Sequence, residues 1–336
     1  MDAARKIAEA VLYEGYLLWP YRRSARKNQQ RWTFGGVYPR AYSVARGEDD
    51  PWLMQTECLA RGDEASVIEV GVRFLHVTER KVGRGEGAAL EFVDELRVGS
   101  ELYLPWDEAT EREVAVGRFD LAGLLREPRR TEVDAPEGSM RETLADPAGE
   151  VVGAVERSWR ALRGTVEVEA ESLGDGLFRV TVRITNTAPW AGEDRETTLR
   201  QTFVSTHTTL EIEGGEFVSL IDPPEECREA AEACENLKTW PVLVGEEGQR
   251  NMLLSSPIIL YDYPQIAPES PGDLFDGTEI DQMLVLNVLT LTDREKEEVR
   301  ASDPRAREIL QRCESLSPEE LMRLNGTFRD VRVLRD

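Results

Sequence analysis

Regular alternation of apolar and polar side chains between residues 164 and 188 restricts the fold of this chain more than any other feature. In the segment GTVEVEAESLGDGLFRVTVRITNTA, every second residue from Phe178 to Ile184 is apolar, and the residues between them are Arg or Thr. Successive side chains of a strand point to opposite faces, so this period predicts a strand with one buried and one solvated face. Gly174-Asp175-Gly176 supplies a turn, and the segment predicts an antiparallel hairpin.

The same period of two recurs between about residues 65 and 220. It is found in VIEVGVRFLHV (67–77), ALEFVDEL (89–96), REVAVGRF (112–119) and TTLRQTFVSTHTTLEIEG (197–214). Strands of this kind predict a large antiparallel sheet, or a sandwich-like pair of sheets, with one solvated face. Residues 127–150 are polar and contain three prolines, so we expect them to form a long connection.

Helical signals flank this β region. Residues 3–18 carry an apolar stripe and are followed by Pro20, which predicts a helix that ends before the proline. Residues 223–238 follow Asp222, a suitable N-cap, and predict one helix inserted in the β region.

The C-terminal part of the chain mixes strand and helix signals. The apolar runs 251–263 and 281–291 are strand candidates. Thr292 with Glu295 forms a capping box, and Asp303-Pro304 marks the start of a further helix.

These signals together predict an α+β fold, with an N-terminal helix, a large antiparallel sheet or sandwich-like region, and short C-terminal helices. The predicted domains are residues 1–50 (helix and basic aromatic arm), 51–290 (β-rich main domain with the inserted helix) and 291–336 (helical tail).

Composition narrows the functions that are open to such a chain. Its 336 residues carry a formal net charge of −23, with a sequence pI of about 4.7. An acidic surface repels duplex DNA and anionic lipid, so we expect neither as a partner. No apolar run approaches the roughly 20 residues that span a bilayer, and the first residues lack the pattern of a secretory signal. We therefore predict a cytoplasmic protein without membrane insertion.

One basic, aromatic-rich stretch contrasts with the acidic character of the whole chain. Between Trp19 and Arg46 there are seven Lys or Arg residues and no Asp or Glu. Arg and aromatic residues are enriched where protein interfaces concentrate their binding energy, and an Arg stacked on an aromatic ring contributes about 0.5–2 kcal/mol. The stretch is therefore a candidate surface for a protein partner. Its predicted contact residues are Trp19, Tyr21, Arg22, Arg23, Arg26, Arg31 and Trp32.

Two other interpretations of this stretch stay open. In the first, the basic arm packs on the acidic body of the same chain and its aromatic side chains fill the core. In the second, it binds single-stranded nucleic acid or an anionic ligand, which suits a mixture of cations and rings but is opposed by the net charge.

The segment YPQIAPESPGDLFDGTEI (263–280) is a second candidate for partner contact. It is long for a connection without secondary structure, and loops of such length are often functional. The acidic residues in and beside it lack the spacing of an EF-hand calcium loop. We predict that contact through this loop uses Asp273, Asp276, Glu279 and Asp281.

Few residues of the chain suit metal binding or catalysis. Cys227 and Cys234 are seven residues apart, two turns on a helix, so one ion cannot bridge both and we expect small core cysteines. His76 shares its strand face with apolar residues and is expected to be semi-buried. His207 lies on the wetter face of its predicted strand, so a metal site that combines it with one cysteine stays open.

The chain also lacks G-x-S-x-G and H-E-x-x-H motifs. We therefore predict no catalytic residue, no cofactor and no bound metal.

Three blocks of the sequence resemble a protein family encoded in bacterial NiFe hydrogenase gene clusters. They are VLYEGYLLWPYRRSARKNQQRWTFGGVYPRAYS (11–43), APESPGDLFDGTEIDQMLVLNVLTLTDREKEEVRASDPRAREIL (267–310) and SPEELMRLNG (317–326). The resemblance implies a non-catalytic accessory role in hydrogenase assembly, maturation or function. Its implied partners are hydrogenase subunits or maturation factors, and it assigns no functional residue.

Two alternatives to this role follow from the residues themselves. One is a metal-dependent enzyme or metallochaperone that uses His207, Cys227 and Cys234. The other is a β-sandwich module that binds a small ligand or single-stranded nucleic acid.

Overall fold

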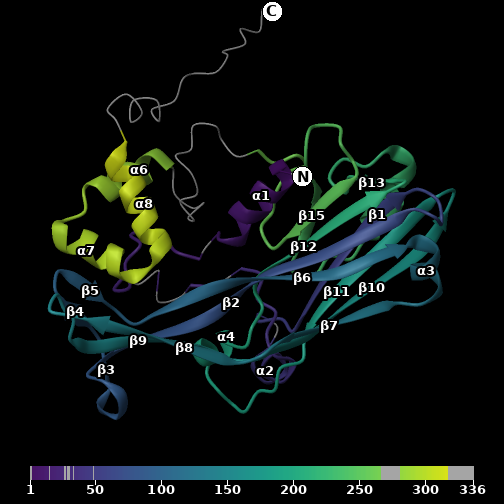
Figure 1. The fold of residues 1–336 in the computed structure, drawn as a ribbon. Helices are drawn as coiled ribbons and strands as arrows, with labels where there is room; N and C mark the ends of the chain where they lie inside the picture. The colour runs from purple at the N-terminus through teal and green to yellow at the C-terminus, as the bar shows by residue number, and fades with distance from the viewer. Residues whose placement is uncertain are drawn as a thin grey trace, which may run out of the picture.

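Two antiparallel sheets packed face to face form the body of the protein (Figure 1). The structure is a computed structural model that describes residues 2–14, 16–25, 28, 31–32, 34–47, 49–265 and 281–316. The predicted α+β class with a large antiparallel β region and short C-terminal helices is confirmed, and the β region is a sandwich.

The smaller sheet has five strands, and the larger has eight. In spatial order the smaller sheet is β13 (Glu216–Val218), β1 (Leu53–Arg61), β11 (Leu177–Asn186), β10 (Leu162–Gly174) and β7 (Arg129–Ala135). The larger sheet runs β14 (Trp240–Leu243), β15 (Met252–Ser256), β12 (Val204–Glu213), β2 (Val67–Arg84), β9 (Val151–Trp159) and β8 (Gly138–Ala145). β6 (Trp106–Asp120) and β3 (Glu91–Val93) also pair with β2, and β4 (Leu96–Val98) pairs with β5 (Glu101–Tyr103).

The main core lies between the two sheets. The predicted hairpin is the β10–β11 pair, and the alternate residues from Phe178 to Ile184 point into this core while Arg179 and Arg183 form ion pairs on the outer face. Facing residues of β2, among them Val72 and Phe74, complete the core. The short helix α3 (Leu121–Arg126) contributes Leu121 and Leu124 to it.

β2 is long enough to belong both to the sandwich and to the part of the sheet beneath the C-terminal helices. Its first half, residues 67–75, pairs with β12, and its last residues, 79–84, pair with β9. β6 runs along the other side of β2 from residue 67 to residue 80. The second half of β2 thus carries the sheet beyond the sandwich, where it becomes a platform for helices (Figure 1).

The C-terminal helices cover this platform. They are α6 (Asp281–Leu289), α7 (Asp293–Ser302) and α8 (Pro304–Ser315), and we call them the helical cap. Their buried side chains share one core with Tyr16 and Leu17 of the N-terminal segment and with Leu75 of β2. None of the described helices combines the length and apolar character needed to cross a membrane.

The remaining helices are short. They are α1 (Asp2–Leu12), α2 (Arg40–Arg46), α4 (Arg195–Leu199), α5 (Arg228–Glu232) and the 3-10 turns η2 (Gly87–Ala89) and η3 (Glu225–Cys227). α1 ends at Leu12 rather than at residue 18, because Tyr13, Tyr16 and Leu17 turn into the cap core whereas Ile7 packs on β14 and β15. The predicted helix 223–238 is reduced to η3 and α5, since Leu237 bonds back to β1.

Two further sequence predictions about secondary structure are wrong. Residues 127–150 form β7 and β8 rather than a connection; most of their side chains are exposed or half-buried, so the sequence shows little apolar alternation there. Residues 281–291 were expected as a strand, but they contain α6, because a short apolar run does not distinguish a strand from a buried helix. The predicted boundary at residue 290 consequently falls inside the cap, and the strand in 251–263 is limited to β15.

Candidate protein-contact site

The basic aromatic stretch is largely built into the molecule. Tyr21, Arg31 and Trp32 have exposed fractions of 0%, 5% and 6%, so a partner cannot reach them in this structure. Trp19, Arg22 and Arg23 are half-buried and remain accessible, and Arg26 lies outside the described residues. The buried residues of the stretch therefore pack on the body of the same chain, as in the first of the two alternative interpretations.

Arg31 is held between two indole rings. Its guanidinium carbon lies 3.7 Å from the ring centroid of Trp106 and 4.6 Å from that of Trp32. Nη2 donates to the backbone oxygen of Asp107 at 2.7 Å, and Nη1 donates to that of Tyr16 at 3.4 Å. Burial lowers the pKa of Arg31, which the nearby acidic groups counteract. These contacts attach the N-terminal segment to the start of β6.

The backbone of this stretch is strained at two positions. Tyr21 and Trp32 have φ angles of 59° and 67°, in the left-handed region that bulky residues avoid. Such conformations cost of order 1–3 kcal/mol each and persist only where packing determines them. The buried rings of both residues, and the stacking on Arg31, provide that packing.

Two cations of the stretch, Arg22 and Arg23, face the helical cap and the strands below it. Arg22 forms a 2.9 Å ion pair with Glu295 of α7, and Ser24 donates its N–H to Glu298 at 2.8 Å. Arg23 has a side chain that is 41% exposed, and its Nη2 approaches the carboxylate of Asp94 at 3.9 Å. Of these side chains, Arg23 is the one most available to a partner.

Asp303, between α7 and α8, joins three segments of the chain. This carboxylate has an exposed fraction of 1%. It accepts hydrogen bonds from the Tyr16 hydroxyl at 2.5 Å, from Trp106 Nε1 at 3.2 Å and, as the N-cap of α8, from the N–H of Arg305 at 2.8 Å. Burial beside this carboxylate raises the pKa of Tyr16 well above its ordinary value, which keeps the hydroxyl protonated as a donor.

Arg80, on the second half of β2, anchors the end of α7. Its Nη2 donates to the backbone oxygens of Ala301 and Ser302 at 2.8 and 2.6 Å, the last carbonyls of that helix. Nε donates to Leu104 O at 3.0 Å, and Nη1 pairs with Glu108 at 2.8 Å. A guanidinium in this position satisfies free C-terminal carbonyls and complements the helix dipole.

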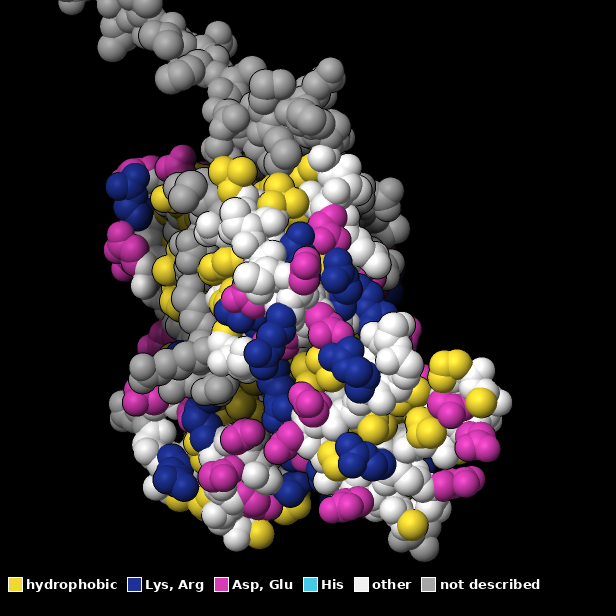
Figure 2. All heavy atoms as spheres, turned by 90° about the vertical axis from the view of Figure 1, so that its left-hand side faces the viewer, with side chains coloured by type: hydrophobic (Ala, Val, Ile, Leu, Met, Phe, Trp, Pro, Cys, Tyr) yellow, Lys and Arg dark blue, Asp and Glu magenta, His cyan; other side chains and the backbone are white. Residues whose placement is uncertain are grey.

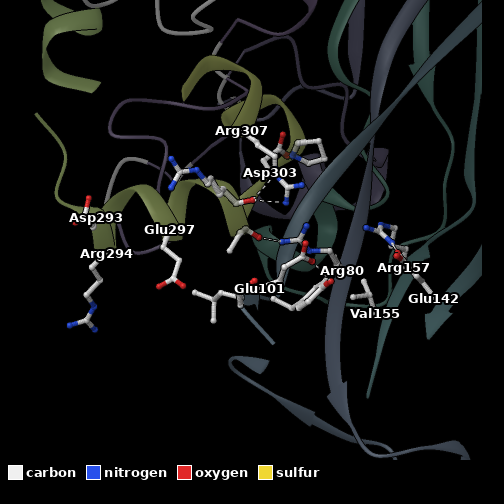
Figure 3. A pocket seen from close by; sticks show the side chains of 16 residues that line it. Arg80, Glu101, Glu142, Val155, Arg157, Asp293, Arg294, Glu297, Asp303 and Arg307 are labelled. Atoms are coloured by element: carbon white, nitrogen blue, oxygen red, sulfur yellow. Dashed lines mark hydrogen bonds and ion pairs between the residues drawn. The ribbon is translucent and has the colours of Figure 1, made fainter. Parts of the chain in front are cut away.

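A cleft of about 900 Å³ opens beside Arg80, between the cap and the strands β5, β8 and β9. We call it the cap cleft. Arg294 and Glu297 project from α7, while Arg157 and Glu142 lie on the strands across from them (Figure 3). Five Arg and five Asp or Glu line it, so its formal charge is balanced. Arg157 bridges Glu108 and Glu142, whereas Arg294 has no ion-pair partner among the described residues.

A second cleft, of about 700 Å³, lies where the N-terminal stretch meets β2, β6 and α4. We call it the arginine cleft. Six cations line it: Arg23, Arg31, Arg80, Lys81, Arg195 and Arg200. Four carboxylates also line it: Glu79, Asp94, Asp107 and Glu196. Trp32 and Trp106 form its aromatic part, and Arg80 lines both this cleft and the cap cleft.

The face of the molecule that carries the cap has a mixed charge pattern. Figure 2 shows Lys and Arg side chains gathered along the middle of this face, interleaved with Asp and Glu. In a chain with a net charge of −23, this clustering of cations is a local exception. A surface of this kind attracts acidic groups while acidic residues around it limit which of them can approach.

The second predicted contact segment is not placed by the structure. Asp273, Asp276 and Glu279 lie outside the described residues. Asp281 is the first residue of α6, but the structure does not describe its side chain. Contact through this loop stays a prediction.

The candidate metal ligands are not brought together. His207 was expected on a solvated face but is 1% exposed, because β12 is an inner strand covered on both faces. Cys227 is buried in η3, and Cys234 follows α5, so they do not share a helix. Within the described part of the chain, no three His, Cys, Asp or Glu side chains are grouped as metal ligands.

His207 forms one arrangement that the sequence did not suggest. Its Nδ1 lies 2.7 Å from Ser205 O, so this nitrogen donates, and Nε2 accepts from the Ser256 hydroxyl at 3.2 Å. A Ser–His pair is the core of many nucleophilic sites. Ser256 has an exposed fraction of 0%, however, and the pair is closed to a substrate in this structure.

Both histidines should make stability depend on pH. Burial lowers the pKa of His76 and of His207 to about 4, whereas an unfolded histidine titrates near 6.5. The unfolded chain thus takes up protons first, so stability is complete above about pH 6.5 and falls as the pH decreases toward 4. We expect a loss of up to about 3 kcal/mol per histidine. The free energy of unfolding, measured by urea denaturation at several pH values between 6.5 and 5, should fall less steeply with decreasing pH for His207→Gln than for the parent chain. An equal pH dependence would contradict the low pKa of the buried His207.

Sequence reasoning missed the residues that build the two clefts. Arg80 lies on β2 beyond the strand predicted for residues 67–77, and Trp106 lies outside every predicted element. Arg200 falls within the strand predicted for residues 197–214, but it follows α4 and precedes β12 in the structure. A signal for Arg80 was present, because it continues the inward-facing series of Phe74 and His76 at a spacing of two. A cation at such a position indicates a buried anchor.

Comparison of the sequence with protein-family models and with curated proteins found no match. The resemblance to the hydrogenase-associated family therefore stays a prediction.

Proposed function

We propose that the protein is a non-catalytic accessory protein that supports the assembly, maturation or function of a NiFe hydrogenase through protein–protein contacts. Hydrogenase subunits or maturation factors are the proposed partners. The partner contact lies along the cap cleft and the arginine cleft, with Arg23 at the accessible edge.

The observation that carries this proposal is the convergence of cations from four parts of the chain. The N-terminal stretch, the end of β2, the residues around α4 and the cap all contribute to adjoining clefts. Arg23 lines both the arginine cleft and a smaller cleft of about 510 Å³ under α7. Arginines beside buried aromatic rings are the residues that give interfaces most of their energy. The resemblance supplies the class of partner.

The metallochaperone alternative has less support. It rests on His207, Cys227 and Cys234, and the first of these is buried in the sandwich away from the surface. No other observation on the described residues favours a metal-dependent role over a contact role.

Reversal of the charge at Arg23 should weaken partner capture without unfolding the protein. The tagged chain would be purified from a host with a NiFe hydrogenase gene cluster, and co-purifying hydrogenase subunits and maturation factors would be quantified by mass spectrometry. For Arg23→Glu we expect at least a tenfold loss of the recovered partner, which corresponds to about 1.4 kcal/mol. Arg23 is half-exposed with one weak ion pair, so the unfolding midpoint should be unchanged.

Arg163→Glu is the matched control, because Arg163 is also exposed and also has one carboxylate at 3.9 Å, on the smaller sheet. It should recover the partner like the parent chain. Equal losses for both variants would point to net charge rather than to this surface. If no hydrogenase protein co-purifies with the parent chain, the proposed function is wrong.

A further inference from the structure

We propose that the arginine cleft is a recognition site for carboxylate side chains, and that it takes an Asp- or Glu-rich segment of the partner protein. This inference rests on the proposed function for the existence of a partner. The preference for carboxylates follows from the residues that line the cleft.

The formal charge of the cleft favours an acidic ligand. Six cations and four carboxylates line it, a formal balance of +2, although the chain as a whole carries −23. Three of its cations are accessible: the side chains of Arg23, Arg195 and Lys81 are 41%, 42% and 44% exposed. Arg23 approaches the almost fully exposed Asp94 at 3.9 Å, whereas Lys81 pairs with Glu79 at 3.1 Å and Arg195 pairs with Asp50 at 3.2 Å. An incoming carboxylate therefore meets three accessible cations, of which Arg23 is weakly engaged.

The interior of the cleft contains guanidinium groups that its own carboxylates do not fully pair. Arg31 is a buried cation, yet no carboxylate of the described residues lies within ion-pair distance of it; two backbone oxygens and two indole rings are its partners. Arg200 pairs with Glu79 and Asp107, but its Nε is buried without an acceptor. Buried polar groups are normally satisfied, so the donors of Arg31 and Arg200 exceed the carboxylate acceptors that the cleft itself supplies.

The size of the cleft and its carboxylates select the kind of acidic partner. A volume of about 700 Å³ admits a few side chains rather than a long strand. The four lining carboxylates would repel the continuous row of phosphates in a nucleic acid, and the net charge of the chain adds to that repulsion. Separate carboxylates on a flexible peptide can pair with individual guanidinium groups, for which bidentate geometry is favourable.

The test uses three fluorescein-labelled probes: hexaglutamate, hexaglutamine and hexathymidylate. Fluorescence anisotropy would be followed on titration with the full chain. We expect hexaglutamate to bind at about 20 mM salt and to weaken at least tenfold near 300 mM, because exposed charges are screened. Hexaglutamine should not bind. The double variant Arg23→Glu/Lys81→Gln should lose at least tenfold in affinity, whereas Arg163→Glu/Arg130→Gln, which makes the same charge change on the smaller sheet, should not.

Three results would overturn the inference: no binding of hexaglutamate at low salt, equal losses in the two double variants, or hexathymidylate binding as tightly as hexaglutamate. The last result would assign the cleft to single-stranded nucleic acid. This test is independent of the capture experiment. If a hydrogenase protein is captured through Arg23 but hexaglutamate does not bind, the accessory role stands and only the acidic specificity is lost.

Discussion

Asp303→Ala should be among the most destabilising single substitutions in the cap. It would leave the Tyr16 hydroxyl and the Trp106 N–H buried without an acceptor, and each such group costs about 1–3 kcal/mol. It would also remove the N-cap of α8, which contributes about 1 kcal/mol. We expect a total loss of about 4 kcal/mol in the free energy of unfolding of the cap. Hydrogen exchange resolved by peptide would measure it, with faster exchange in α7 and α8 than in β10 and β11.

Two further variants separate the parts of this effect. Asp303→Asn keeps an N-cap oxygen and should cost less, about 1–2 kcal/mol. Asp134→Ala removes a carboxylate that is 72% exposed, and it should change stability by less than about 0.5 kcal/mol. If Asp303→Ala behaves like Asp134→Ala, the carboxylate does not join the three segments.

Arg80→Met should detach the C-terminal end of α7 from the sheet. The methionine fills much of the same volume, but it cannot donate to Leu104, Ala301 and Ser302, and it leaves Glu108 with Arg157 alone. Each buried carbonyl oxygen that loses its donor costs about 1–3 kcal/mol, while Glu108 keeps the charge of Arg157 beside it. We expect a lower urea unfolding midpoint and a loss of exchange protection that begins in the cap.

Arg163→Met provides the comparison for this substitution, since Arg163 is 62% exposed and should tolerate the change. Arg80→Lys tests geometry, because an ammonium group has no planar fork with which to reach carbonyls on two sides. A midpoint for Arg80→Lys equal to that of the parent would show that charge alone is sufficient. Arg80→Met and Asp303→Ala act on one corner, so their effects should combine non-additively.

The sheet was predictable from the sequence where one face of a strand is buried and the other solvated. β10 and β11 are the best example, because Val180 and Val182 face the core while Arg179 and Arg183 face water. The same rule failed at β8, an edge strand whose residues from Ser139 to Thr143 are all exposed. Without a buried face, a strand has no apolar period to detect.

The site was only partly predictable, because its residues are brought together by contacts between distant segments. The basic stretch was recognised by composition, which does not report burial, and so Arg31 and Trp32 were assigned to a surface. Their partner Trp106 lies more than 70 residues further along the chain, at the start of a strand with no unusual composition around it. Local patterns identify such residues only when a partner is near in sequence.

The hydrogen bond between Tyr16 and Asp303 joins residues that are 287 positions apart, and this separation sets the order in which the molecule can be completed during translation. The sandwich strands leave the ribosome before the cap and need no cap residue for their core. The aromatic N-terminal segment, although made first, waits for its last partners. At about 5–20 residues per second, that wait lasts roughly 15 to 55 seconds. A nascent chain that stops before α8 therefore presents unburied tyrosine and tryptophan side chains, the kind of surface by which chaperones and proteases distinguish unfinished proteins from finished ones.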